Sequence, residues 1–177
     1  MKKIFGIGLP KTGQTSLAIA MRSLGYKTVQ YPYTSLRIKN NNFALDLPVT
    51  MNYKKLDKKY PNSKFILTIR DFDPWLKSMR NHYRRHPASK RYKQQLMFRL
   101  EFWGTVNFNK RLMTKKYYKH LEDVAQYFKG RKKDLLTINI CNGEGWKKLY
   151  SYLNKKIPRK PFPKENIGKY QKANFLV

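Results

Sequence analysis

Acidic residues are scarce in this sequence of 177 amino acids. There are 10 Asp and Glu residues against 39 Lys and Arg residues, which gives a formal net charge of +29 at pH 7. A surplus of this size places much of the surface at positive potential, and such a surface attracts polyanions. Candidate partners are nucleic acid, an anionic glycan, an acidic membrane face or an acidic protein. The alternative, that many of the lysines are merely solvated, stays open.

Cysteine and long apolar runs are also rare. Cys141 is the single cysteine, so no disulfide can form within the chain. No run of about 18 apolar residues occurs, so we expect no membrane-spanning helix. Strand-like residues begin at Ile4, directly after Met1, Lys2 and Lys3, which leaves no room for a signal peptide. We therefore expect a cytoplasmic protein in a reducing compartment.

Internal repeats and flexible linkers are absent from the sequence. With 41% hydrophobic residues, a chain of this length can bury roughly 70% of its unfolded surface. We expect one domain over residues 1–177, in which the basic C-terminal tail, 155–177, packs on the surface.

Strand-like and helix-like segments alternate along the chain. We predict strands at 3–7, 27–30, 64–69 and 134–140. We predict helices that begin at Thr15 and at Asp73-Pro74, where Asp73 is the N-cap and Pro74 the first helical residue. Further helices are predicted at 49–59, through most of 90–128, and at 145–153. Residues 31–43 are polar and irregular. The alternation predicts an α/β fold with three layers, in which helices flank a central, mostly parallel sheet. Ligands of such sheets bind at the carboxyl ends of the strands, where the first loop, Asp46 and Arg70 are expected to meet.

The first loop carries the strongest motif, Gly8-Leu9-Pro10-Lys11-Thr12-Gly13-Gln14-Thr15-Ser16. It lies between a predicted strand and a predicted helix, where glycines and helix N–H groups form an anion site. Its spacing nearly matches the P-loop of nucleotide-binding proteins, but Gln14 stands where that loop has lysine, and Lys11 lies inside the loop instead. The missing lysine disfavours an ATPase, a GTPase or a nucleotide kinase. An ordinary glycine turn is the structural alternative.

A second motif follows the strand at 64–69. Arg70 leaves the end of that strand, and Ser78 lies eight residues later on the next predicted helix. An arginine fork together with a hydroxyl suits a phosphate monoester. In the alternative, Arg70 pairs with Asp71 or Asp73 and Ser78 faces solvent.

Together these segments resemble the sulfotransferase family, over nearly the whole chain. Residues 10–16 resemble its 5′-phosphosulfate loop, and residues 65–71 with 75–78 resemble its 3′-phosphate motif. Residues 143–149 and 161–163 resemble the C-terminal part of one compact branch. The resemblance implies the P-loop-like fold of that family, with transfer of a sulfuryl group from 3′-phosphoadenosine 5′-phosphosulfate (PAPS) to a hydroxyl or amine of an acceptor.

The resemblance also implies roles for individual residues. Lys11 would contact the oxygen that bridges sulfate and 5′-phosphate, the segment Thr12, Gly13, Gln14, Thr15 and Ser16 would hold the 5′-phosphate, and Arg70 and Ser78 would hold the 3′-phosphate. Gln14 replaces a residue that is usually threonine in this loop, so a hydroxyl contact is lost. No metal is required.

Asp46 is the candidate base that takes the acceptor's proton. Cytosolic family members carry a histidine in a His-x-Pro step after a strand, and the matching step here is Asp46-Leu47-Pro48. An aspartate near pKa 4 is a weak base unless burial raises its pKa, and we expect the neighbouring cations to push that pKa down. Capping of the following helix, or pairing with a lysine, is the alternative role.

Other functions compete with the enzyme. The net charge and Gln14 favour a protein that binds nucleic acid or another polyanion on a sulfotransferase-like fold without turnover. His82 and His86 are four residues apart, but Arg84 and Arg85 lie between them, so a solvated basic face is favoured over a metal pair. Cys141 has no identified base nearby and is interpreted as structural. The acceptor, which the basic surface suggests is large or acidic, is not identified by the sequence.

Overall fold

One parallel sheet forms the centre of the computed structural model, which describes residues 2–165. Its strands within that range are β1 (Ile4–Gly6), β2 (Thr28–Gln30), β3 (Phe43–Leu45), β4 (Lys64–Thr68) and β5 (Leu135–Ile138). They lie in the order β2-β3-β1-β4-β5, and every neighbouring pair is parallel. β1 and β3 are buried along their whole length, as expected of central strands covered on both faces.

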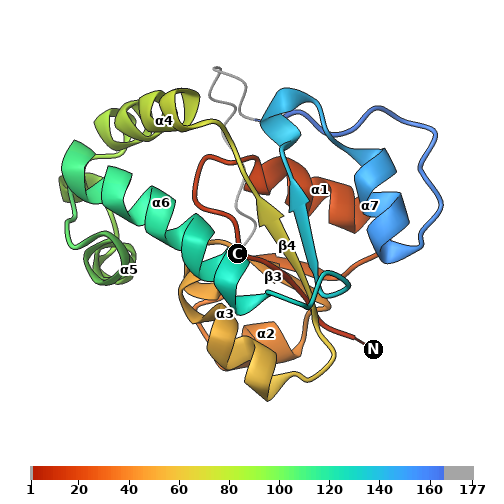
Figure 1. Ribbon diagram of the computed structural model, residues 1–177. Coiled ribbons are helices and arrows are strands. Elements are labelled where there is room, and N and C mark those ends of the chain that lie inside the picture. Colours follow the sequence, from red (N-terminus) through yellow and green to blue (C-terminus); the bar gives the residue numbers. More distant parts are fainter. Residues whose placement is uncertain (1, 166–177) are drawn as a thin grey trace.

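Helices cover both faces of the sheet (Figure 1). On one face, α1 (Gln14–Ser23) and α7 (Trp146–Leu153) bury Leu17, Met21 and Leu149 against the strands. On the other face, α3 (Leu47–Lys59) and α6 (Lys110–Tyr127) bury Val49 and Val124. The three layers confirm the predicted α/β class with a parallel central sheet.

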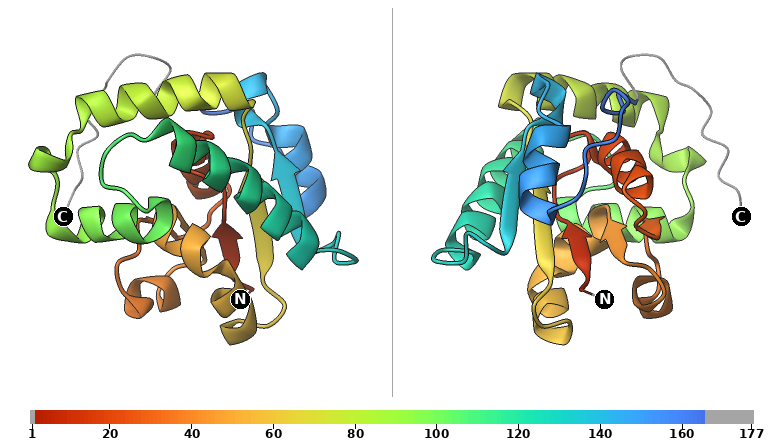
Figure 2. Two further views of the ribbon diagram at one scale, coloured as in Figure 1. Left: turned by 60° about the vertical axis from the view of Figure 1, so that its left-hand side comes forward. Right: turned by 90° about the vertical axis from the view of Figure 1, so that its right-hand side faces the viewer.

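A third apolar cluster lies beyond the carboxyl ends of the strands. It joins α4 (Phe72–Arg85), α5 (Lys93–Trp103) and α6 around Trp75, and it includes Leu9 from the loop after β1 and Leu47, the first residue of α3. Figure 2 shows α4 crossing the end of the molecule toward which the strand arrows point. The loops at this edge of the sheet therefore rest on a packed apolar base.

Several local predictions were wrong. β3 and α2 (Ser35–Lys39) lie in or beside a segment that looked irregular. Most of 90–128 is helical, as predicted, in two helices, α5 and α6, that are separated at Gly104, whose φ is 72°. α4 begins at Phe72 with Asp71 as N-cap, so Asp73 is not the cap. Two short 3₁₀ helices, η1 (Ala88–Lys90) and η2 (Ile140–Asn142), were not predicted.

The described part of the C-terminal tail packs back onto the domain. The Trp146 indole donates to the Lys160 carbonyl over 2.8 Å, and the Trp146 and Phe162 ring centroids are 4.9 Å apart. The Glu165 N–H donates to Ser16 Oγ over 2.9 Å, so the tail returns to α1. Residues 166–177 of the predicted tail lie outside the described residues. Within residues 2–165, no helix is both long enough and apolar enough to cross a membrane.

Candidate functional site

The loop from Gly8 to Gly13 joins β1 to α1 at the carboxyl edge of the sheet. It is tightly packed: a Cβ on Gly8 would lie 1.9 Å from Thr68 Oγ1, so only glycine fits there. Lys11 and Gly13 have φ angles of 70° and 95°. These positive φ angles turn the backbone sharply just before α1.

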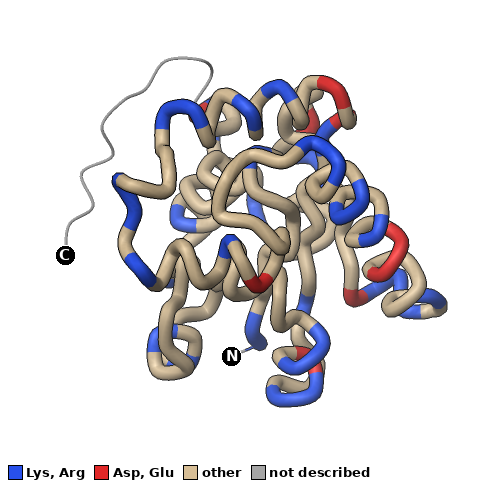
Figure 3. Tube along the Cα trace, turned by 90° about the vertical axis from the view of Figure 1, so that its left-hand side faces the viewer, with Lys and Arg blue, Asp and Glu red and all other residues tan. Residues whose placement is uncertain are grey.

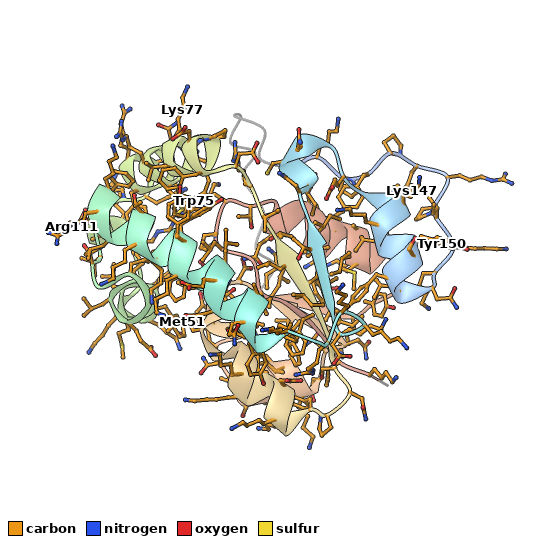
Figure 4. The ribbon with its side chains drawn as sticks, viewed as in Figure 1. Met51, Trp75, Lys77, Arg111, Lys147 and Tyr150 are labelled. Carbon is orange, nitrogen blue, oxygen red and sulfur yellow. The ribbon has the colours of Figure 1, made fainter. Side chains whose placement is uncertain are left out.

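Five consecutive carbonyls of this loop, from Ile7 to Lys11, are bound by side chains. His120 Nε2 binds the Ile7 carbonyl (2.8 Å), and Gln14 Nε2 and Thr50 Oγ1 both donate to the Gly8 carbonyl (2.6 and 2.9 Å). Thr12 Oγ1 donates to the Leu9 carbonyl (2.6 Å), Trp75 Nε1 to the Pro10 carbonyl (2.9 Å) and Arg70 Nη1 to the Lys11 carbonyl (3.2 Å). Burial lowers the pKa of His120 to about 4, so its ring is neutral, and its Nε2 carries the proton because a carbonyl only accepts. Figure 4 shows Trp75 directed inward from α4, while Lys77 of the same helix points away.

This arrangement leaves the N–H groups of the loop for a ligand. In a trans peptide the N–H of one residue points opposite to the carbonyl of the residue before it. The N–H groups of Gly8, Leu9, Lys11 and Thr12, which follow bound carbonyls, therefore point away from the side chains that hold those carbonyls; Pro10 has no N–H. α1 begins directly afterwards, with Gly13 as N-cap and neither a side-chain cap nor an acidic residue in its first turn. The loop and the helix N-terminus together can bind an anion.

Lys11 adds a positive charge to this site. Burial lowers the pKa of Lys11, and the charges of Arg85 and Arg70 lower it further. The same Lys11 charge contributes to lowering the pKa of His82, which burial brings to about 3. Cations from three segments of the chain thus gather around one loop, and an anionic ligand would relieve their mutual repulsion.

α4 presents one face to the loop. Ser78, His82 and Arg85 are four and three residues apart and share a face of the helix with Trp75, whose indole binds the Pro10 carbonyl. Ser78 is half-buried. Arg70 lies at the entry to this helix, where Tyr117 Oη donates to its carbonyl over 2.6 Å.

The guanidinium of Arg70 contacts the first loop through the Lys11 carbonyl, and within residues 2–165 it forms no ion pair with Asp71 or Asp73. The alternative in which Arg70 pairs with those aspartates is therefore wrong for this structure.

Gln14 joins the first loop to the loop after β3. Its side chain is buried, and its Nε2 donates to the Gly8 carbonyl while its Oε1 accepts from the Asp46 N–H over 3.1 Å. One amide therefore holds two strand ends in fixed register. The side chain of Gln14 is occupied inside the protein, so only its backbone N–H, in the first turn of α1, is left for a ligand.

Asp46 stands at the start of α3 but does not cap it with its side chain. Its carboxylate accepts from Gln30 Nε2 over 3.3 Å and from the backbone of Tyr31, and the residue is 8% exposed. Burial raises the pKa of Asp46 from 3.8 to about 6, against these two hydrogen bonds. Burial raises this pKa, as the sequence analysis allowed, but the groups that lower it are Gln30 and Tyr31 rather than the expected neighbouring cations. A carboxyl with this pKa is a better proton acceptor than an exposed aspartate.

Backbone strain is concentrated at this edge of the sheet. Lys11, Tyr31 and Asp46 follow β1, β2 and β3, and all have positive φ, at 70°, 48° and 82°. Asp46 combines its φ with a ψ of −179°, a region populated almost only by glycine. Such strain costs about 1–3 kcal/mol per residue and is typical of functional sites.

The structure brings most of the predicted residues to one place. Arg70 donates to the Lys11 carbonyl, the Asp46 N–H donates to Gln14, and Ser78 is on the helix face that Trp75 turns to the loop. Thr12 Oγ1 is 2.6 Å from Thr68 Oγ1, and Ser16 Oγ accepts from Glu165, so both hydroxyls are engaged inside the protein. Thr15 is half-buried at the first turn of α1.

Sequence reasoning missed the side chains that hold the loop. They are Thr50, Thr68, Trp75, His120 and, beside Asp46, Gln30. The one available signal was the position of His120 at helical spacing from the apolar residues of α6, which predicts a buried histidine in need of a partner.

Other candidates behave differently from expectation. His82 and His86 lie together, with ring centroids 4.8 Å apart, but burial lowers the pKa of both, so they are not simply solvated. Cys141 is exposed in η2, within the field of Lys11 and Arg70. Among residues 2–165, no group of three or more His, Cys, Asp and Glu side chains is arranged to hold a metal ion. Surface hollows of about 430 and 440 Å³ lie elsewhere, against α2 and the end of α3 and along α6.

A family model described as "Sulfotransferase domain" matches residues 34–170, which include Asp46, Arg70 and Ser78. The loop at Gly8–Gly13 precedes the matched range, so its assignment depends on the geometry above. No curated protein matches the chain.

Proposed function

Since the chain belongs to the sulfotransferase domain family, we propose that it transfers a sulfuryl group from PAPS to a hydroxyl or amine of an acceptor. The observation that carries the proposal is the run of five bound carbonyls in the first loop, which turns the loop's N–H groups toward a ligand beside Lys11. PAPS supplies the sulfuryl group and two phosphates, and the site has separate donors for each phosphate.

The residues divide between the two ends of the nucleotide. The N–H groups from Lys11 to Ser16 and the start of α1 suit the 5′-phosphosulfate. Arg70 and Ser78 suit the 3′-phosphate, because a guanidinium fork and a hydroxyl match a phosphate monoester. The hydrogen bond from Arg70 to the Lys11 carbonyl holds the two subsites at a fixed separation.

Two side chains would act in the transfer itself. Asp46 takes the proton that the acceptor loses as its oxygen or nitrogen bonds to sulfur. Lys11 stabilises the charge left on the 5′-phosphate when the bond from sulfur to the bridging oxygen breaks. These two roles balance the reaction. The acceptor's proton goes to Asp46, and the electron pair of the broken bond between sulfur and the bridging oxygen stays on the 5′-phosphate.

Calorimetry with adenosine 3′,5′-bisphosphate, ATP and a short oligonucleotide tests the proposal. We expect the bisphosphate to bind more tightly than ATP, and Lys11→Ala and Arg70→Ala to weaken its binding about tenfold or more, as expected for loss of a charge-assisted hydrogen bond. Lys147→Ala is the matched control, because Lys147 is exposed on α7 and points away from the loop (Figure 4). Equal binding of ATP and bisphosphate, or equal effects of the three variants, would contradict the proposal.

The basic surface supports a second candidate, binding of a polyanion without turnover. Figure 3 shows Lys and Arg distributed over the helices and loops, with few acidic residues among them, in agreement with the net charge of +29. That function predicts oligonucleotide binding that falls steeply with salt and is indifferent to Lys11→Ala and Arg70→Ala. The same calorimetry therefore separates the two functions.

A further inference from the structure

Two arginines without acidic partners in residues 2–165 act on Tyr31, whose backbone donates to the carboxylate of the candidate base. Arg99 in α5 is 6% exposed, and its guanidinium donates to the carbonyls of His86 and Val106, both over 3.2 Å. The same guanidinium lies 4.2 Å from the centre of the Tyr83 ring. Among residues 2–165, no carboxylate forms an ion pair with Arg99. Its charge is therefore held by carbonyl dipoles and a ring face alone.

Arg91 is less satisfied still. It lies between η1 and α5, and its Nη1 donates to Gln95 Oε1 over 3.1 Å. Its Nε is buried and has no hydrogen-bond partner in the described part of the chain, where Arg91 also forms no ion pair. A buried charged donor without a partner is costly, so such groups deserve a functional explanation.

Aromatic residues connect Arg91 to Asp46. Gln95 Nε2 donates to Tyr33 Oη over 3.4 Å, and the ring centroids of Tyr33 and Tyr31 are 6.0 Å apart. The backbone of Tyr31 in turn donates to the Asp46 carboxylate. Arg91 thus belongs to the same group of contacts as the base, at the ends of β2 and β3.

The cations of the site form two groups. Arg70 and Arg85 act on Lys11, whereas Arg91 and Arg99 act on the phenol of Tyr31, beside Asp46. His82 lies between the groups, because its pKa is lowered by Lys11 as well as by Arg91 and Arg99. The proposed function assigns the phosphosulfate to the first group, at Lys11, which leaves the second group, at Tyr31, for the acceptor.

We propose that Arg91, supported by Arg99, binds an anionic group of the acceptor, so that the acceptor carries a carboxylate, sulfate or phosphate near the group that is sulfated. This inference rests on the proposed function, because it places the acceptor on the Asp46 side of the nucleotide. A guanidinium fork matches each of these anions, and Arg91 forms no ion pair within residues 2–165 that would compete for it. The rings of Tyr31 and Tyr33 offer an apolar surface next to that donor.

Binding of two matched phenols to the full chain tests the inference. The protein is first saturated with adenosine 3′,5′-bisphosphate, and 4-hydroxyphenylacetate and 4-hydroxyphenylacetamide are then titrated separately by calorimetry. We expect the carboxylate to bind about tenfold more tightly than the amide, as a charge-assisted hydrogen bond predicts. Arg91→Gln should remove this difference. Arg111→Gln, which makes the same charge change at an exposed position of α6 directed away from the site, should retain it (Figure 4).

Each outcome decides the matter. Equal affinity for the two phenols, binding of neither, or equal loss of the difference in both variants would overturn the inference. Saturation with the bisphosphate is measured first and reports on the proposed function alone, and Arg91→Gln should leave that binding unchanged within about twofold. Binding of the bisphosphate without preference for the carboxylate would therefore refute the anionic acceptor and leave the sulfotransferase proposal standing.

Discussion

Replacing Asp46 by asparagine should stabilise the fold while it abolishes most of the activity. Asp46 is 8% exposed, and burial opposes its charged form. Asparagine offers a neutral oxygen that can still accept from Gln30 and from the backbone of Tyr31. Because the positive φ remains, the variant removes the charge and little else.

The magnitude follows from the pKa. A carboxyl that has pKa 3.8 when unfolded and about 6 when folded binds its proton more tightly in the folded state. The contribution of Asp46 to the free energy of unfolding is then greatest at low pH and is lost as pH rises between about 4 and 6, because ionisation of this carboxyl favours the unfolded chain. At about 1.4 kcal/mol per pH unit, the difference between the two values corresponds to about 3 kcal/mol at neutral pH. Asparagine is neutral at every pH and avoids this loss.

Urea unfolding of both proteins at a series of pH values measures the effect. We expect equal free energies of unfolding near pH 3.5 and an advantage for Asp46→Asn that grows to about 3 kcal/mol above pH 6.5. In parallel, turnover of a suitable acceptor should fall about 10²- to 10⁴-fold, the usual contribution of a general base. Turnover by the unaltered protein should increase with pH through about 6, as the Asp46 carboxyl loses its proton.

Two results would refute this reasoning. If Asp46→Asn were less stable than the unaltered protein at pH 7, the carboxylate would be stabilising and its burial would not dominate its pKa. If the stability difference were the same at pH 4 and pH 7, the residue would not titrate in this range. Near-normal turnover in the variant would separately remove Asp46 from the role of base.

Three further predictions concern the loop. Gly8→Ala should destabilise the fold by about 3 kcal/mol in urea unfolding, because the new Cβ would overlap Thr68; a loss below about 0.5 kcal/mol would contradict the packing. Gln14→Leu should cost about 2 kcal/mol by leaving the Asp46 N–H without its acceptor, and unchanged stability would show that this bridge is dispensable. Alkylation of Cys141, followed by mass spectrometry, should slow about tenfold when adenosine 3′,5′-bisphosphate is present at ten times its Kd but not with adenosine; equal rates would place the nucleotide elsewhere.

The sequence predicted the fold class because its strongest signals are local. The run of apolar and β-branched residues at 64–69 indicates a strand whatever surrounds it, and β4 is there. β3 is different, since Phe43–Leu45 is too short for a periodic pattern. Its burial comes from pairing with β1 and β2, which are distant in the chain, and such pairing is not visible in a local window.

The candidate site divides in the same way. Lys11 and Arg70 were predicted from motifs whose spacing is local, and the structure joins them by a hydrogen bond. The inward rotation of Gln14 was not predictable, because its two partners come from separate loops. Nor was the pKa of Asp46, because desolvation depends on atoms contributed by several elements at once.

The amide of Gln14 makes the nucleotide loop and the proton acceptor one mechanical unit. Any force that an incoming phosphate exerts on the Gly8 peptide is passed through a single side chain to the Asp46 peptide. Changes at the two ends should accordingly be non-additive, and the energies of paired variants would not equal those of the single ones. Under the proposed function, a change at Gly8 that alters donor affinity is therefore expected to shift the Asp46 peptide as well.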